Sequence, residues 1–529
     1  MNSWYKLLRL IHTLKYIRFN QLFYQIKYRI NTNQVSLINS LCPVVSETIF
    51  LKPFIRNSNS YQDNEFVFLN KKQKFKTIDW NFNTYGKLWT YNLNYFDFIN
   101  QCNLDTETSL KLMLDYCNSS SNLKDGLEPY PISLRTINWI KFISKHKINN
   151  ETINLRLYND YLILLSKLEY HIKANHLLEN AYSLFFGAHY FKDIEWLQKA
   201  ENLLNKELIE QILPDGAHYE LSPMYHKIIL LRNLDCYNLA ISNNFCSEKI
   251  IKILYNTSSK MISWLNAISF NNDEIPLVND SSLEITPENY ILRDYASSLN
   301  IKFNNITLKE SGYRKLNHLS FEVLFDVGQI APSYQPGHSH ADNLNILLNY
   351  NNEKIIVDTG ISTYEKNKIR QNERSSVSHN VITYNNLDSS DVWSGFRVGK
   401  RAQTEVINET ASEIEATHDG YKSKGIQINR KLKKTNQGIQ IIDSSNSLNV
   451  KLIGRFHFHP NTTLELSNNQ ITVNKKIIIT FTDIESLFIR EFNWCKEFNV
   501  TELASKLEYT FVNKCNIEIT TKNENIISY

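Results

Sequence analysis

A dense polar cluster stands in the second half of the chain, where the run 336–342 (PGHSHAD) contains His338 and His340. Side chains at i and i+2 of an extended backbone point to the same face, so both imidazoles can approach one small site. Asp358 and His379 follow at intervals that fit ligands donated by neighbouring strands. Imidazole nitrogens with a carboxylate are a usual zinc set, so the pattern indicates a metal site, with hydrogen-bonded structural histidines as the competing interpretation.

A second polar cluster lies in the first half of the chain, at Asn175, His176 and Glu179. These residues are three and four positions apart, so a helix would place them on one side, where they can line a cleft.

A third cluster is the run 215–226 (DGAHYELSPMYH), which has the composition of a turn that leads into a helix. Ser222 and Pro223 are typical of the N-cap and of the first helical position. Tyr225 would then be held rigidly near a helix start, although a lone tyrosine on a helix is ordinarily structural.

The apolar periodicity changes near the middle of the chain, and this change predicts the elements that position the clusters. From about 105 to 300 the apolar residues recur at helical spacing, whereas from about 319 they alternate in short β-branched runs. Helices followed by strands indicate an α+β multidomain protein. We expect a basic N-terminal arm at 1–60, an α/α toroid at 61–305 and an antiparallel β-sandwich at 306–529.

The composition excludes several classes of protein. The 529 residues include 58 Lys and Arg against 54 Asp and Glu, so the net charge of +4 gives no global field for nucleic acid. With 42% hydrophobic and 21% charged residues, the chain is neither disordered nor membrane-spanning. Seven scattered cysteines do not predict a disulfide framework and favour a reducing compartment.

The first 46 residues contain six basic side chains and no acid, interleaved with apolar residues near helical spacing. This arm has two interpretations, namely a helix on a membrane surface and an amphipathic segment packed on the main body. The N-terminal sequence does not have the pattern of a signal peptide, and no apolar run is long enough to predict a membrane-spanning helix.

Eight ordered motifs resemble the heparinase II/III family, and together they cover about 80 to 460. They are LWTYNLNYFDF at 88–98, EPYPISLRTINWIKF at 128–142, NHLLENAYSLFFGAHYF at 175–191, DGAHYELSPMYHKIIL at 215–230, IPLVNDSS at 275–282, GHSHADNLNILL at 337–348, VDTGISTYE at 357–365 and RSSVSHNVITYNN at 374–386. The resemblance implies an α/α toroid followed by a β-sandwich, and a polysaccharide lyase that acts on acidic, uronic-acid glycans.

The same resemblance implies roles for single residues. Asn175 and His176 would contact the uronate carboxylate, and Glu179 matches the acid that follows them. Tyr225 would act as acid or base, with His338 as the second acid or base across the sugar ring. Tyr219, in the same loop, is the rival to Tyr225.

Three residues match the zinc ligands of the family, namely His340, Asp358 and His379, and the zinc would be structural. Two arginines, Arg135 and Arg374, are candidates to bind carboxylates or sulfates of the glycan, with internal salt bridges as the alternative.

The basic start of the chain resembles family members encoded with bacterial surface-polysaccharide assembly. This likeness implies a capsule, O-antigen or exopolysaccharide substrate. It also implies a place in the cytoplasm or at the inner membrane face, with peripheral membrane contact through the arm.

Two alternatives remain. A zinc-dependent hydrolase would use the same histidines to activate water, but it would need alternating strands and helices after His340. A non-catalytic glycan-binding protein of the same fold would have lost part of the catalytic set, which is present here.

Overall fold

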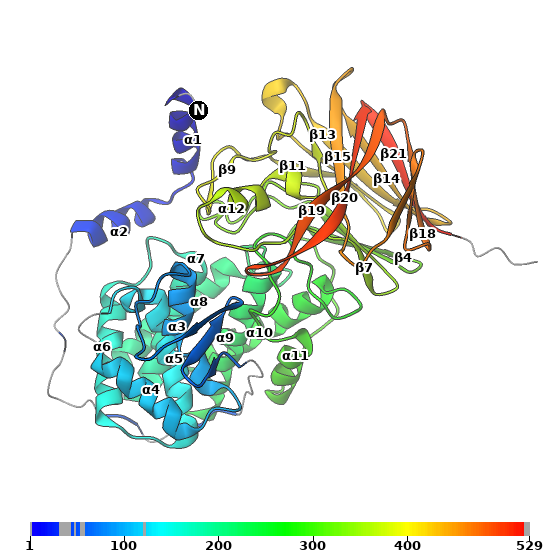
Figure 1. The fold of residues 1–529 in the computed structure, drawn as a ribbon. Coiled ribbons are helices and arrows are strands. Elements are labelled where there is room, and N and C mark those ends of the chain that lie inside the picture. The colour runs from blue at the N-terminus through cyan, green and yellow to red at the C-terminus, as the bar shows by residue number, and fades with distance from the viewer. Residues whose placement is uncertain are drawn as a thin grey trace, which may run out of the picture.

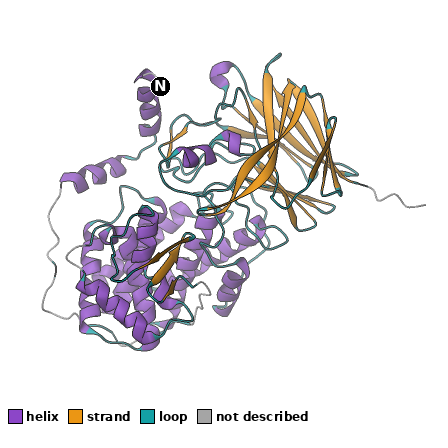
Figure 2. Ribbon diagram, in the orientation of Figure 1, coloured by secondary structure: helices purple, strands orange, loops and turns teal. Residues whose placement is uncertain are grey.

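The computed structural model describes residues 3–30, 37, 44–46, 49–52, 59–119 and 123–522. Helices fill the first half of the chain and sheets the second half, and the two halves lie side by side (Figures 1 and 2). The sequence-based prediction of an α+β protein is therefore confirmed, while the toroid and the sandwich stay predictions.

The helical half is built from helices of 9 to 21 residues. They are α3 (Lys87–Tyr95), α4 (Thr106–Asn118), α5 (Pro129–His146), α6 (Glu151–Ser166), α7 (Ala174–Phe191), α8 (Ile194–Gln211), α9 (Pro223–Ser242), α10 (Glu248–Ile268) and α11 (Asn289–Ser298). Helix α7 is buried along almost its whole length and packs against α5, α8 and α9. Helix α7 therefore lies inside the core of the helical half, and it carries Asn175 and His176 at its N-terminal end.

A small sheet that the sequence did not predict precedes these helices. Its strands are β1 (Tyr61–Gln62), β2 (Glu65–Phe68) and β3 (Lys71–Lys74), paired antiparallel in that order. Strands this short carry little periodicity, and tight turns with Asn64 and Asn70 in the left-handed region connect them.

The second half consists of antiparallel sheets. Strands β4 (Tyr313–His318), β5 (Phe321–Asp326), β6 (Ile346–Tyr350) and β7 (Glu353–Ile356) form one sheet in that order. A second sheet has the order β19 (Ser486–Glu497), β20 (Val500–Val512), β15 (Lys451–His457) and β8 (Ile382–Thr383). Short strands β9 (Val392–Trp393) and β10 (Arg397–Val398) pair with each other.

The largest sheet has eight strands, ordered β11-β12-β13-β14-β21-β18-β17-β16. They are β11 (Thr404–Glu409), β12 (Glu413–His418), β13 (Ile428–Lys434), β14 (Gly438–Ser445), β16 (Leu464–Ser467), β17 (Gln470–Val473), β18 (Ile477–Thr482) and β21 (Lys514–Thr521). In the part of the chain described here, one short α-helix, α12 (Lys368–Glu373), and two three-residue 3-10 helices stand among the strands that follow His340. The alternation that the zinc-hydrolase hypothesis needs is absent there, so that hypothesis is wrong.

The two halves share packed surfaces. Trp494 and Val357 of the sheet half belong to the same hydrophobic cluster as the helices, and Trp264 of α10 packs in a cluster with Tyr313 and Leu324. Helix α11 ends at Ser298 and strand β4 begins at Tyr313, so the expected boundary at 305/306 falls in the connection between them.

The N-terminal arm forms two helices, α1 (Ser3–Leu14) and α2 (Phe19–Ile30). Both lie beside the body of the molecule, α1 near β9 and α2 toward the helical half (Figure 1). Across all the described helices, none is both long and apolar enough to span a bilayer.

Candidate active site

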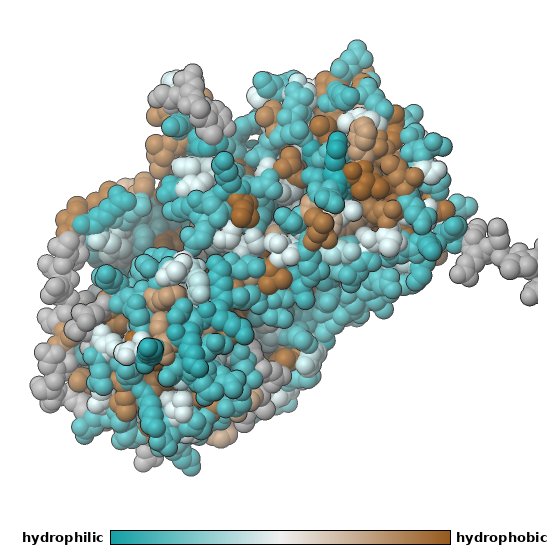
Figure 3. Space-filling view, viewed as in Figure 1, coloured by the Kyte–Doolittle hydropathy of each residue, from teal (hydrophilic) through white to brown (hydrophobic). Residues whose placement is uncertain are grey.

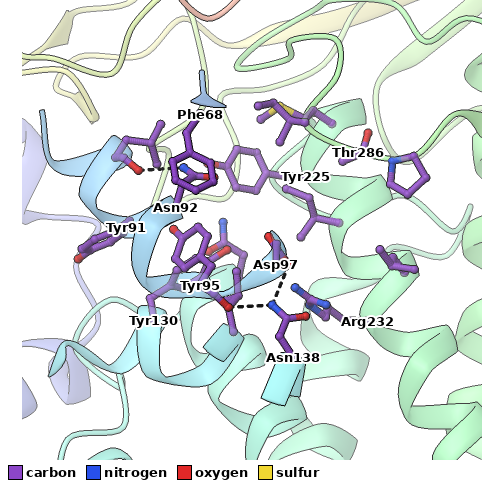
Figure 4. A pocket seen from close by; sticks show the side chains of 18 of the residues that line it. Phe68, Tyr91, Asn92, Tyr95, Asp97, Tyr130, Asn138, Tyr225, Arg232 and Thr286 are labelled. Carbon is purple, nitrogen blue, oxygen red and sulfur yellow. Dashed lines mark hydrogen bonds between the residues drawn. The ribbon is translucent and has the colours of Figure 1, made fainter. Parts of the chain in front are cut away.

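A cavity of about 1150 Å³ opens between the helical half and the sheet half. Four predicted catalytic residues line it: Asn175, His176, Tyr225 and His338. Aromatic rings, among them Tyr95 and Tyr130, and polar groups surround the space (Figure 4). Aromatic faces and convergent polar groups in a cavity of this size are features of a ligand-binding site, and flat faces of this kind can pack on sugar rings.

Tyr225 is positioned by the local sequence, as its predicted helix start implied. The Ser222 hydroxyl accepts a hydrogen bond from the Tyr225 backbone N–H at 3.2 Å, and Pro223 occupies the first turn of α9. The Tyr225 hydroxyl hydrogen bonds with that of Tyr364 at 3.3 Å. Burial raises the pKa of Tyr225, so its phenol is neutral and can donate a proton.

His338 lies directly on Tyr225. The two rings are stacked with 3.9 Å between their centroids and an interplanar angle of 28°. No sugar ring fits between rings in contact, so the expectation that His338 acts across the sugar from Tyr225 is wrong. Both side chains line the same cavity.

Asp280 holds His338 in place. Its Oδ2 accepts a hydrogen bond from His338 Nδ1 at 2.8 Å, and its Oδ1 accepts one from His340 Nε2 at 2.9 Å. The predicted convergence of the two histidines is therefore present, and the shared group is a carboxylate. A hydrogen bond at Nδ1 leaves Nε2 of His338 as the nitrogen that can accept a proton.

A buried arginine keeps Asp280 charged. Arg370 of α12 makes a two-pronged ion pair with the carboxylate, with Nη2 at 2.6 Å from Oδ2. Burial alone would raise the pKa of Asp280. The guanidinium and the two imidazoles outweigh burial and hold this pKa well below its usual range. A charged Asp280 fixes the orientation of both histidine rings.

Asn175 and His176 lie at the start of α7, on the cavity wall. Asn175 Nδ2 is 3.0 Å from Oε2 of Glu220, another cavity residue, and its Oδ1 has no partner. His176 Nδ1 is 3.0 Å from Oε1 of Glu169. Burial lowers the pKa of His176, but the Glu169 carboxylate more than offsets this, so the net pKa is raised and the cationic ring is favoured.

Glu220 is buried, and burial raises its pKa. A protonated carboxyl group is a hydrogen-bond donor, whereas a carboxylate only accepts. Glu220 can therefore change what the amide of Asn175 presents to a ligand.

Glu179 does not reach the cavity. Its side chain is fully buried in α7, 3.4 Å from Arg232, and burial raises its pKa to about 7. Glu179 was predicted to bind substrate, but of the pair only Arg232 lines the cavity, so Glu179 is placed to act on that arginine.

Tyr219 lies outside this cavity as well. Its hydroxyl hydrogen bonds with the Tyr334 hydroxyl at 2.7 Å, in a separate pocket that also contains Glu210 and Arg18. Of the two rival tyrosines, only Tyr225 lines the main cavity.

The two arginines predicted to bind glycan are internal, so that prediction is wrong. Arg135 is fully buried and pairs with Asp160 at 2.8 Å. Arg374 is fully buried and donates to the backbone carbonyl of Ser339, between the two histidines. Arg374 therefore supports the segment that carries His338.

The predicted zinc ligands only partly fit a metal. His340 Nδ1 and His379 Nε2 are buried without a partner, and the two rings lie 5.2 Å apart. Each ring uses its other nitrogen on a carboxylate, Asp280 and Asp358 respectively, which is how metal-bound histidines are commonly held. Asp358 already accepts hydrogen bonds from His379, Asn345 and the Gly360 backbone. Across the described part of the chain, no group of three such side chains is arranged to hold a metal ion.

Sequence reasoning missed several residues that build the site. Asp280 and Tyr364 stand inside motifs that had been noted, IPLVNDSS and VDTGISTYE, but neither was given a role. Glu220 lies in the Tyr219–Tyr225 loop and is distinguished only by its burial. Arg370 has no local signal, because its partner is 90 residues away in sequence.

Known proteins resemble this chain in sequence and in fold. A family model described as heparinase II/III N-terminus matches residues 83–308, and one described as heparinase II/III-like, C-terminal matches residues 302–522. A heparin-sulfate lyase of Bacteroides stercoris is 24% identical over 252 residues, which are 42% of this chain and 37% of the relative. A heparin-sulfate lyase of Pedobacter heparinus is 26% identical over 255 residues, 43% of this chain and 38% of the relative. The matches thus span less than two fifths of each relative.

Solved structures extend the likeness to most of the fold. A crystal structure of heparinase III has a TM-score of 0.66 at 13% identity, covering 85% of this chain and 81% of that one. The heparan sulfate lyase HepC from Pedobacter heparinus has a TM-score of 0.56 at 16% identity, covering 87% and 82%. Because the two family models together span residues 83–522, the chain belongs to the heparinase II/III-like family.

Proposed function

We propose that this protein is a polysaccharide lyase that cleaves a uronic-acid-containing glycan by β-elimination. The observation that carries the proposal is the stacked pair of Tyr225 and His338 in the cavity, with His338 oriented by Asp280. The names of the related heparin-sulfate lyases support the same reaction class.

In the proposed reaction, Nε2 of His338 takes the proton from C5 of the uronate. The electron pair of that C–H bond forms the C4=C5 double bond as the C4–O4 bond breaks. The departing O4 takes the proton of the Tyr225 hydroxyl. Positioned proton transfer of this kind contributes about 10²–10⁴-fold in rate.

The uronate carboxylate must be stabilised while the C5 proton is removed, since the intermediate is enolate-like. His176 in its cationic form and the amide of Asn175 are the proposed partners. A protonated Glu220 can donate to Asn175 Oδ1, which turns the amide N–H groups toward the substrate.

Because the rings of Tyr225 and His338 are stacked, we propose that both groups act on the same face of the sugar. This arrangement favours elimination in which the proton and the leaving oxygen depart from one face. Elimination from one side needs the C5 hydrogen and O4 on the same face of the sugar. In a 4-linked gluco-configured uronate that condition holds for glucuronate, whereas its C5 epimer iduronate has them on opposite faces. We therefore propose a preference for the glucuronate configuration.

The natural polymer belongs to the proposal as well. A glycosaminoglycan is favoured by the names of the relatives, and a bacterial capsule, O-antigen or exopolysaccharide by the resemblance of the basic arm. Incubation with uronate polymers of either C5 configuration tests the function. New unsaturated, ultraviolet-absorbing ends are expected, mainly from glucuronate polymers, and products with only saturated ends would contradict elimination.

A structural zinc at His340 and His379, with Asp358 as the third residue, is likewise a proposal. The unpartnered nitrogens of the two histidines support it. The metal would stiffen the segments around His338 and would take no part in proton transfer.

A further inference from the structure

The two N-terminal helices have two faces with different surroundings. At roughly 100° per residue, the side chains that touch the body of the protein fall on one side of each helix, and large apolar side chains fall on the other. The body-facing contacts are polar and aromatic, so they leave the apolar stripes uncovered.

Helix α1 is held through its polar side. Arg9 pairs with Asp391, with Nε at 2.8 Å from Oδ2, and Thr13 Oγ1 accepts a hydrogen bond from Trp393 Nε1. Its opposite side carries an exposed stripe at helical spacing. The stripe consists of Trp4, Leu7, Leu8, Ile11 and Leu14.

Helix α2 repeats the arrangement. Gln21 and Tyr28 hydrogen bond to backbone carbonyls of residues 172 and 168, and Tyr24 stacks on Tyr170 at 4.5 Å. Its opposite side carries a second exposed stripe. That stripe consists of Phe19, Leu22, Phe23, Ile26 and Ile30.

The side chains of these stripes are more exposed than large apolar side chains on the surface helices of soluble proteins usually are. Phe19 is 83% exposed, Ile30 75% and Trp4 65%. Apolar side chains are visible along both helices from the same side of the molecule (Figure 3). A contiguous exposed apolar surface of this kind marks a site of interaction.

The charge of the arm identifies the partner. Residues 3–30 contain six Lys and Arg and no Asp or Glu. Arg9 and Arg18 pair with acids of the body, which leaves Lys6, Lys15, Lys27 and Arg29 to face a partner. Lys27 and Arg29 are exposed and flank the stripe of α2 on its two sides at helical spacing. An apolar stripe bordered by cations matches an anionic bilayer surface, where the apolar groups enter the headgroup boundary and the cations meet lipid phosphates.

We propose that α1 and α2 form a membrane-binding surface, defined as the two stripes with their flanking cations, that docks this protein on an anionic lipid bilayer. The body contacts of Arg9, Tyr24 and Tyr28 hold the two helices in place, so the surface exists before lipid is met. This proposal is independent of the lyase reaction, because no residue of the surface lines the cavity.

Flotation of the full chain with vesicles tests the proposal. Binding to phosphatidylglycerol-containing vesicles is expected, with little binding to pure phosphatidylcholine. Phe23→Glu with Ile26→Glu should weaken the binding at least about tenfold, and Lys27→Gln with Arg29→Gln about tenfold. The matched control, Leu448→Glu with Leu503→Glu, changes two exposed leucines of the sheet half and should bind as the parent does.

Two results would overturn the proposal. One is equal flotation of the parent and the Phe23→Glu, Ile26→Glu variant. The other is a parent protein that does not float with vesicles and is a dimer in light scattering, while the Phe23→Glu, Ile26→Glu variant is a monomer. That result would mean that the stripes bind a second copy of the chain. Activity on a free glycan should be unchanged in all these variants, which separates loss of docking from loss of folding.

Discussion

The imidazole of His338 stacks on the phenol of Tyr225 at 3.9 Å, although one residue belongs to the sheet half and the other to a helix. The acid and base of the proposed reaction are thus assembled only when the two halves of the molecule pack. A substitution that loosens the interface between the halves is therefore expected to lower catalytic activity before it lowers the stability of either half.

Removing the Tyr225 hydroxyl tests the proposed acid. Tyr225→Phe should lower turnover by about 100-fold or more while leaving glycan binding nearly intact, because only a proton-transfer group is lost. His338→Ala should do the same. Tyr219→Phe is the control, since its hydroxyl bonds to Tyr334 outside the cavity. Near-normal elimination by Tyr225→Phe beside an inactive Tyr219→Phe would move the role to Tyr219.

Asp280→Asn tests the orientation of His338. It should lower kcat by about 100-fold, since the ring loses the acceptor that fixes its tautomer. It should also cost about 3–5 kcal/mol in the free energy of unfolding, because Arg370 becomes an unpaired buried charge. Arg370→Gln breaks the ion pair but keeps the carboxylate at His338, so it should match the loss of stability with a smaller loss of kcat. An unchanged pH profile of kcat in Asp280→Asn would argue against the orienting role.

The Glu220 proton is expected to matter for activity. Burial raises the pKa of Glu220, and above that pKa the group loses its donor and repels a uronate. The parent enzyme should therefore lose kcat/KM on the alkaline side, whereas Glu220→Gln keeps a donor at every pH and should lose less. Asn175→Ala should cost about 100-fold, as for a lost donor to a developing oxyanion. Parallel pH profiles of the parent and Glu220→Gln would contradict this role.

Stability should fall in mild acid because of buried histidines. Burial lowers the pKa of His226 to about 3, below its ordinary 6.5. The unfolded chain takes up a proton at His226 below pH 6.5 and the folded chain does not, so stability present above 6.5 is lost as the pH falls toward 3. The slope from this residue is about 1.4 kcal/mol per pH unit. Denaturation of His226→Gln across this range should show a shallower slope, and equal slopes would exclude the contribution.

Elemental analysis tests the zinc proposal. About one zinc per chain is expected, and His340→Ala should lose both the metal and thermal stability, since metal binding and folding are coupled. His418→Ala removes another buried histidine of the sheet half and should keep the metal. A metal-free parent, or full occupancy in His340→Ala, would refute the assignment.

Features fixed by local chemistry could be predicted from the sequence. The N-cap at Ser222 and Pro223 placed Tyr225 correctly, because capping depends on three or four adjacent residues. The spacing of His338 and His340 correctly predicted that both imidazoles reach one small site, although it did not predict that Asp280 is the group they share. The change of apolar period located the two halves of the fold.

Features that depend on tertiary pairing could not be predicted. The sequence around Arg135 is compatible with an arginine that binds substrate, but in the structure Arg135 forms a buried ion pair with Asp160 of the next helix. The Asp280–Arg370 pair joins residues from opposite halves, and nothing near either position signals it. The stacking of His338 on Tyr225 depends on how the halves dock, which no periodicity encodes.

The Asp280–Arg370 pair also has an evolutionary consequence. Either charge alone would be stranded in the interior, so a single substitution at one position harms stability before any benefit can be selected. Descendants are expected to retain both residues or to replace both, and a lineage that had lost the proposed reaction would still be constrained at these two positions. Persistence of the pair in an inactive descendant would thus record the cost of losing it, and Tyr225 would be the better marker of retained catalysis.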